Sequence, residues 1–143
     1  IVVLNKKNQV FLAKRIDNPK NFWQMPQGGV DKGEEYYNAA LRELKEETSI
    51  KSVSLIKEID GLTTYFLPDH LVGIIWKGKY KGQKQKWFIT RFVGEESEIN
   101  LNTKHAEFID WKWIEPELLP KVIVNFKKDL YLNLLKEINL VIG

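Results

Sequence analysis

The chain has 143 residues, of which 43% are hydrophobic and 29% charged, with a formal net charge of +3 and a pI near 9.0. This length suits one domain with a buried core, so we expect residues 1–143 to form a single domain. Cysteine is absent, which excludes disulfides and thiolate metal sites, and no apolar run approaches the roughly 18 residues of a membrane span. We expect a cytoplasmic protein with no membrane partner.

Two short apolar segments open the chain. Residues 1–4 (IVVL) and 10–14 (VFLAK) flank a polar turn at residues 5–8 and predict a β-hairpin. Residues 23–26 then predict a short strand, which leads into a glycine-rich turn at residues 28–33.

The segment that begins at this turn carries the main functional signal. Residues 28–50 read GGVDKGEEYYNAALRELKEETSI and predict a helix over about 35–48. At roughly 100° per residue, Glu43, Glu46 and Glu47 lie within about a third of a turn of one another. Like charges at this spacing repel, so we expect a cation to offset them. Because hard divalent ions bind a few carboxylates together with substrate phosphates, the pattern predicts a metal and a phosphate-bearing ligand.

The same helix has an opposite, apolar face. Tyr36, Tyr37, Ala40 and Leu44 give it surface to bury while the acids stay in water. The alternative is an ordinary charged surface helix. That alternative is disfavoured because the acids belong to a long gapped pattern, which comprises Gly28, Glu34, Arg42, Glu43, Leu44, Glu46, Glu47 and Ile50.

The rest of the chain predicts strands and a second helix. Segments rich in β-branched and aromatic residues predict strands at 53–59, 62–67, 72–80, 86–93 and 108–113. Phe126, Leu130, Leu134 and Ile138 recur at every fourth position and predict an amphipathic helix. Taken alone, this order of elements indicates an α+β or α/β protein.

The pattern in residues 28–50 resembles the Nudix box, G-x5-E-x7-R-E-U-x-E-E-x-G-U, in which U is a bulky aliphatic residue. Its eight residues fill the box in register, and Ser49 stands where the box has glycine. A left-handed residue with a Cβ at a helix end costs on the order of 1 kcal/mol, so Ser49 bears on the helix end and not on the ligands. The resemblance implies an α/β fold, a Nudix-type α/β/α sandwich with a mixed sheet, and hydrolysis of a diphosphate linked to another group.

Three further stretches resemble one branch of this family, the bacterial RNA 5′-pyrophosphohydrolases. They read WQMPQGGVD at 23–31, GQKQKWF at 82–88 and, less specifically, FKKDLY at 126–131. The resemblance implies a Mg²⁺-dependent enzyme, with Mn²⁺ or another divalent cation as alternatives, that removes pyrophosphate from the 5′ end of triphosphorylated RNA and promotes mRNA decay. The near relatives of this branch hydrolyse diadenosine tetraphosphate, so a dinucleoside polyphosphate is the alternative substrate.

The resemblance also implies the roles of the acids. Glu43, Glu46, Glu47 and Glu107 hold the metal ions, and Glu46 or Glu47 polarises the attacking water. A carboxylate near cations stays ionised, which suits these roles. Glu107, just ahead of the predicted strand at 108–113, acts as a metal ligand or a general base, and the alternative for it is an exposed loop acid.

The substrate contacts implied in the same way come from distant parts of the chain. Arg15 lies near the phosphates, and Gln83, Val124, Phe126 and Lys127 lie around the base and phosphates. An aromatic ring beside a lysine suits a nucleotide, because the ring stacks on the base and the ammonium meets phosphate. Phe126 has a core alternative, since it begins the apolar stripe of the last predicted helix.

Other conspicuous residues are assigned structural roles. The resemblance to the Nudix box implies that Arg42 and Glu34 form ion pairs with neighbouring helix and loop groups, which fix the turn and position the ligands. Tyr65 is left out of the site, because it could equally be a core residue of the strand predicted at 62–67. His70 and His105 have no metal-site spacing and are expected on polar loops.

Two rival functions are disfavoured by the sequence. A binding module that had lost its chemistry would have a broken acid set, whereas the three helix glutamates are intact. Hydrolysis of oxidised nucleoside triphosphates is disfavoured because the stretches at 23–31 and 82–88 match a different branch. Basic stretches at 77–86 and 121–128 are expected to attract a polyanion such as RNA, although scattered solvating lysines are the alternative.

Overall fold

The computed structural model describes residues 1–17, 22–66, 82–104 and 106–143. Its main sheet has five strands in the order β3-β6-β1-β2-β7. β1 and β6 run parallel while the other neighbours run antiparallel, so the sheet is mixed. The strands are β1 (Val2–Leu4), β2 (Val10–Arg15), β3 (Val53–Glu58), β6 (Phe88–Phe92) and β7 (Phe108–Ile114).

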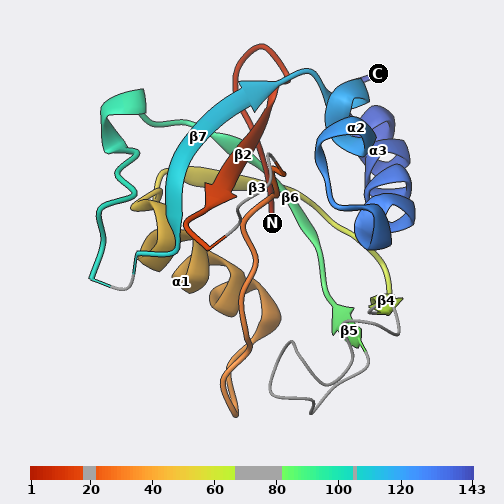
Figure 1. Cartoon of the computed structure of the whole chain (residues 1–143), viewed down its shortest axis with the longest axis horizontal. Helices are drawn as coiled ribbons and strands as arrows, with labels where there is room; N and C mark the ends of the chain where they lie inside the picture. Colours follow the sequence, from red (N-terminus) through yellow and green to blue (C-terminus); the bar gives the residue numbers. More distant parts are fainter. Residues whose placement is uncertain (18–21, 67–81, 105) are drawn as a thin grey trace.

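Helices cover both faces of this sheet (Figure 1). α1 (Tyr36–Thr48) lies on one face, and α2 (Leu119–Val122) and α3 (Lys128–Ile142) lie on the other. The structure therefore confirms the expected α/β class and the α/β/α sandwich. In the described part of the chain, no helix is long and apolar enough to cross a membrane.

The central strands bury side chains on both faces because successive residues of a strand point in opposite directions. Val3 and Phe11 belong to the core cluster beneath α1, whereas Val2 and Leu12 belong to the cluster beneath α3. All four side chains are inaccessible to solvent. This explains why the first two strands are almost continuously apolar and lack the alternation of a sheet with one wet face.

The carboxylate helix ends where the sequence indicates, but its packing differs in part from the prediction. Tyr36 is 50% exposed, and Glu47 is buried although the acids were expected to stay in water. Leu44 is fully buried against the sheet, and Ala39 is buried beside it. Ser49 ends the helix with φ 67° and ψ 4°, in the left-handed region, and its N–H donates to the carbonyl of Lys45 at 2.9 Å. The Ser49 hydroxyl donates to the carbonyl of Asn100, also at 2.9 Å. The helix end thus keeps a left-handed geometry without glycine.

Most predicted strands are confirmed, but the sequence did not predict the strand pair that follows β3. β4 (Thr63–Phe66) pairs antiparallel with β5 (Gly82–Gln85) in a separate two-stranded sheet. β5 was not predicted, because its sequence GQKQ contains no β-branched or aromatic residue. The strand predicted at 72–80, together with His70 and His105, lies outside the described residues.

Two boundaries differ from the prediction. The strand predicted at 23–26 is wrong: Gln24 forms an isolated bridge with Ala13, and the Trp23 N–H donates to the carbonyl of Val122 at 2.9 Å. Pro26 has no N–H to extend a ladder, which limits this segment to a single bridge. The last helix begins at Lys128, so Phe126 precedes it.

A buried tyrosine holds the segment before the glycine-rich turn. The Met25 N–H donates to the hydroxyl of Tyr131, in α3, at 2.8 Å, and both side chains are buried. Trp87 packs edge-on against Tyr131 with ring centroids 6.4 Å apart. The α3 core therefore fixes the start of the turn that leads into α1.

We expect Ser49→Gly to be more stable than Ser49→Ala by about 1 kcal/mol, because glycine adopts the left-handed conformation without the Cβ penalty. Both variants lose the bond to Asn100, so their difference isolates the backbone term. Urea unfolding of the two proteins measures it. Equal stabilities would show that position 49 is not strained.

Candidate active site

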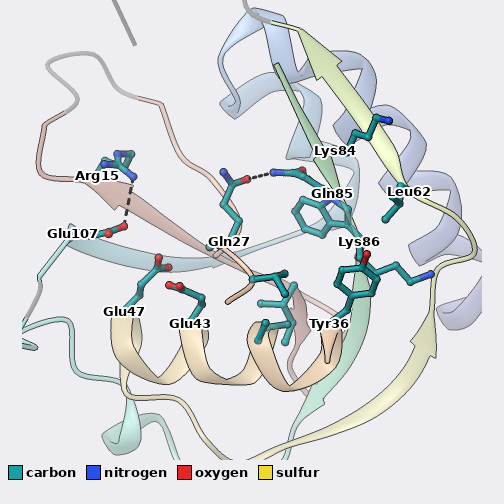
Figure 2. Close-up of a pocket in the computed structure, with 17 residues that line it drawn as sticks. Arg15, Gln27, Tyr36, Glu43, Glu47, Leu62, Lys84, Gln85, Lys86 and Glu107 are labelled. Carbon is teal, nitrogen blue, oxygen red and sulfur yellow. Dashed lines mark hydrogen bonds and ion pairs between the residues drawn. The ribbon is translucent and has the colours of Figure 1, made fainter. Parts of the chain in front are cut away.

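A cavity of about 680 Å³ lies beside α1, the glycine-rich turn and β5 (Figure 2). An acidic group with one arginine lines one side, basic and apolar residues line the other, and Gln27 lies between them. The labelled lining residues are Arg15, Glu43, Glu47 and Glu107 on the first side, and Tyr36, Leu62, Lys84, Gln85 and Lys86 on the second.

Glu47 is the most buried of these acids, with 3% of its surface exposed. Its Oε2 atom has no hydrogen-bond partner among the described residues. Burial, followed by the negative charges of Glu107 and Glu43, raises the pKa of Glu47 from 4.5 to about 9. A buried carboxylate with an unpaired oxygen and like charges beside it is a site at which a cation would bind favourably.

Glu43 projects from the preceding turn of α1 into the same cavity (Figure 2). Its side chain is 18% exposed, and burial raises its pKa while a hydrogen bond from Arg42 opposes that rise. Gly28 lies directly against it, and a Cβ at position 28 would overlap the Glu43 carboxylate group. Glycine at this position therefore lets the turn backbone approach the acids closely.

Arg42 joins the turn to the helix, as expected from the sequence. Its guanidinium donates to Glu34 at 2.8 and 2.9 Å and to the carbonyl of Gly29 at 2.8 Å. The bonds from Arg42 to Glu34 hold the pKa of Glu34 down at about 2. The same guanidinium bonds to Glu43 at 3.0 Å and Glu46 at 3.3 Å, so it also balances the charge of the helix face.

The structure separates Glu46 from the other acids. Its side chain is 52% exposed and bonds to Arg42, and it does not line the cavity. In residues 1–17, 22–66, 82–104 and 106–143, no three acidic or histidine side chains lie close enough together to hold one ion. The four predicted ligands are thus not assembled as a coordination shell.

Arg15 and Glu107 meet at the cavity edge, at the ends of neighbouring strands. The Arg15 guanidinium lies 3.6 Å from the Glu107 carboxylate and 2.8 Å from that of Asp17 (Figure 2 shows the first contact). The Ile16 N–H donates to the carbonyl of Glu107 at 2.8 Å. This backbone bond places Glu107 opposite α1, although Glu107 is 60 positions beyond Glu47 in the chain.

Phe126 and Lys127 gather around Tyr65 and do not line the cavity itself. The Phe126 ring lies 5.9 Å from that of Tyr65, and the Lys127 ammonium lies 5.1 Å from the Tyr65 centroid. Burial, with repulsion from Arg15, lowers the pKa of Lys127 to about 8. Val124 is half-buried against the core beneath α3.

The residues that sequence reasoning missed are two glutamines. Gln27 and Gln85 both line the cavity and are hydrogen-bonded to each other at 2.9 Å. Each lies in one of the stretches that carry the branch resemblance, which was the available signal. The predicted contact Gln83 lies in β5, opposite Tyr65 in the pairing with β4.

Glu47 predicts a pH-dependent stability for the metal-free protein. A carboxyl group with a higher pKa in the folded protein than in the unfolded chain favours folding at low pH, and this contribution is lost as pH rises. For Glu47 that window runs from 4.5 to about 9. We expect Glu47→Gln to lose less stability over this window than the wild type. Thermal unfolding in chelator at several pH values measures it, and parallel pH profiles would contradict it.

Comparison with known proteins adds three findings. A Pelagibacter ubique protein named RNA pyrophosphohydrolase is 67% identical over 131 residues, which cover 92% of this chain and 83% of that protein. A Sphingopyxis alaskensis protein of the same name is 45% identical over 139 residues, covering 96% and 88%. The solved E. coli dihydroneopterin triphosphate pyrophosphohydrolase superposes with a TM-score of 0.72 at 22% identity, covering 95% and 92%, which shows the fold alone.

A family model described as the NUDIX domain matches residues 1–134. That range includes the glycine-rich turn, α1 with its carboxylates and the strand that follows Glu107. The box pattern, the α/β/α sandwich and this match agree, and the chain belongs to the Nudix family.

Proposed function

We propose that this protein is a divalent-cation-dependent pyrophosphohydrolase that removes pyrophosphate from the 5′ end of triphosphorylated RNA. The observation that carries the proposal is the convergence of Glu43, Glu47, Glu107 and Arg15 on one cavity. The relatives named RNA pyrophosphohydrolase, at 67% and 45% identity, support the choice of substrate. A cytoplasmic location suits an RNA substrate.

The donor set fits a hard divalent cation. Mg²⁺ and Mn²⁺ prefer carboxylate oxygens, and Glu47 presents a buried oxygen with no partner among the described residues. Glu43, Glu46, Glu47 and Glu107 are the residues proposed to hold it, and Glu43 and Glu46 would exchange their bonds with Arg42 for the ion. When bound, such a cation neutralises phosphate charge and lowers the pKa of water.

The acids of the chain supply the proton chemistry. Water attacks one phosphorus atom, and a carboxylate from Glu46, Glu47 or Glu107 accepts its proton. Glu107 is supported in this role by its position at the cavity edge, 3.6 Å from the guanidinium of Arg15. The products are RNA with a 5′-monophosphate and pyrophosphate, or two phosphates released in turn.

The basic and aromatic residues recognise the substrate. Arg15 is proposed to pair with the phosphates, since it already binds two carboxylates at the cavity edge. Phe126, Val124 and Gln83 are proposed around the first bases, with Lys127 on a phosphate. The 8% exposure of Lys127 strengthens such a contact, because burial reduces screening by water.

A dinucleoside polyphosphate remains the alternative substrate. It shares with triphosphorylated RNA a polyphosphate attached to a 5′ nucleoside, and the same acids and cations would serve both. The difference lies beyond the first nucleotide, where RNA continues as a polyanion that the basic stretches attract.

Glu43→Gln, Glu47→Gln or Glu46→Gln should each lower kcat at least about 100-fold, because each removes a charge from the proposed metal site. Glu35→Gln is the matched control, since Glu35 is exposed just before α1 and makes no capping bond. It should change kcat less than about twofold. Release of pyrophosphate from triphosphorylated RNA measures all four variants. Near-normal turnover of Glu46→Gln alone would remove that residue from the ligand set and leave the others in place.

Triphosphorylated RNA of about three nucleotides should exceed a free nucleoside triphosphate in kcat/KM, because Lys84 and Lys86, which line the cavity, would attract the additional phosphates. The preference should shrink as salt is raised. Diadenosine tetraphosphate is expected to be cleaved measurably in the same assay. Equal efficiency with the free nucleotide would replace the RNA end with a small nucleotide, and reaction with diadenosine polyphosphates alone would select the alternative.

A further inference from the structure

Two glutamines and a tryptophan form a hydrogen-bond chain along the wall of the cavity. The Trp87 Nε1–H donates to Gln85 Oε1 at 3.0 Å, and the Gln85 Nε2–H donates to Gln27 Oε1 at 2.9 Å. Figure 2 shows the second bond, which connects the segment before α1 to β5. The chain therefore joins two parts of the protein that are 58 positions apart.

Trp87 is the only one of these three side chains whose hydrogen-bonding direction is fixed by its chemistry. An indole N–H donates and never accepts, whereas a primary amide can turn over and exchange its oxygen with its NH2 group. Trp87 is only 2% exposed, so its N–H depends on the Gln85 oxygen as acceptor. This bond turns the Gln85 NH2 group toward Gln27. The Gln27 oxygen must then face Gln85, and its NH2 group points away.

Gln27 also has a hydrogen-bond contact with the Tyr65 phenol, whose pKa is raised by burial. Because the Gln27 oxygen faces Gln85, the Gln27 NH2 group is the part of the amide that is left for this contact. An amide nitrogen carries two hydrogens, so a bond to Tyr65 leaves one of them for another acceptor.

The direction of the Gln27 amide matters because of where it lies. Gln27 lines the cavity between the acidic side, which carries Glu43 and Glu47, and the β5 side (Figure 2). Phosphate oxygens accept hydrogen bonds and do not donate them when ionised. An NH2 group turned away from Gln85 can donate to such an oxygen, whereas a carbonyl in the same place would repel it.

We propose that Gln85 is a positioning residue, which holds the Gln27 amide so that its NH2 group donates to a phosphate oxygen of the substrate. The inference rests on the proposed function for its polyphosphate ligand. The buried indole of Trp87 fixes the orientation before the substrate arrives, so no amide rotation has to be completed on binding.

A double-mutant cycle tests the indirect action of Gln85. Gln85→Met and Gln27→Met should each raise KM for triphosphorylated RNA about tenfold and change kcat less than about twofold, as expected for one bond to a charged group. The double variant should also show about a tenfold increase, because Gln85 acts through Gln27. Gln9→Met, the same substitution in the β1–β2 turn, should leave KM unchanged. An unchanged KM for Gln85→Met, or an additive increase of about 100-fold in the double variant, would overturn the proposal.

Gln85→Glu serves if Gln85→Met does not fold, because its carboxylate still accepts from the Trp87 indole. It forces the Gln27 NH2 group to turn toward position 85. KM should therefore rise, and part of that increase should disappear when Gln27→Met is added. Full additivity of these two substitutions would overturn the proposal.

A spectroscopic measurement separates this inference from the proposed function. The NMR signal of the Trp87 indole N–H should shift in Gln85→Met and stay in place in Gln27→Met. If the wild type does not hydrolyse triphosphorylated RNA, the proposed function fails, and the cycle is repeated on the Kd for inorganic tripolyphosphate. The positioning role would then be overturned if the effects of Gln85→Met and Gln27→Met on that Kd were additive. It would also be overturned if the indole signal did not shift in Gln85→Met.

Discussion

The bonds of Arg42 are the interaction on which the site depends. One guanidinium binds Glu34 and the Gly29 carbonyl in the turn while it also bonds Glu43 and Glu46 on α1. Without a positive charge at this point, acids three and four residues apart would repel one another along the helix. Arg42 thus lets a helix rich in acids form and holds its first turns against the glycine-rich loop.

The sheet determines what faces that helix. β2 and β7 pair so that Arg15 lies opposite Phe108, which places Glu107 beside the carboxylates of α1. The core beneath α3 fixes the opposite wall, because Tyr131 holds Met25 and packs against Trp87. The polar atoms of the cavity are therefore carried by segments whose own side chains are buried, which keeps them in a defined arrangement.

The sequence predicted the local elements well and the composition of the cavity less well. The hairpin and the carboxylate helix follow from periodicity and turn chemistry, and the structure confirms them. The left-handed conformation of Ser49 is a finding of the structure, since serine in place of the box glycine had left the helix end open. β5 was missed because GQKQ has no strand propensity of its own and exists through pairing with β4. Gln27 and Gln85 were passed over for a related reason: amide side chains carry no charge or periodic pattern that marks them as functional.

By itself, the sequence determined that three glutamates share one face of α1, because helical geometry depends only on spacing along the chain. It also determined the family, because a long gapped pattern survives in one continuous segment. Only the tertiary structure decided that Glu47 is buried in the cavity while Glu46 faces solvent beside Arg42. It alone brought Glu107 and Gln85 to the same cavity, because contacts between distant segments depend on strand order and core packing, which no local pattern encodes.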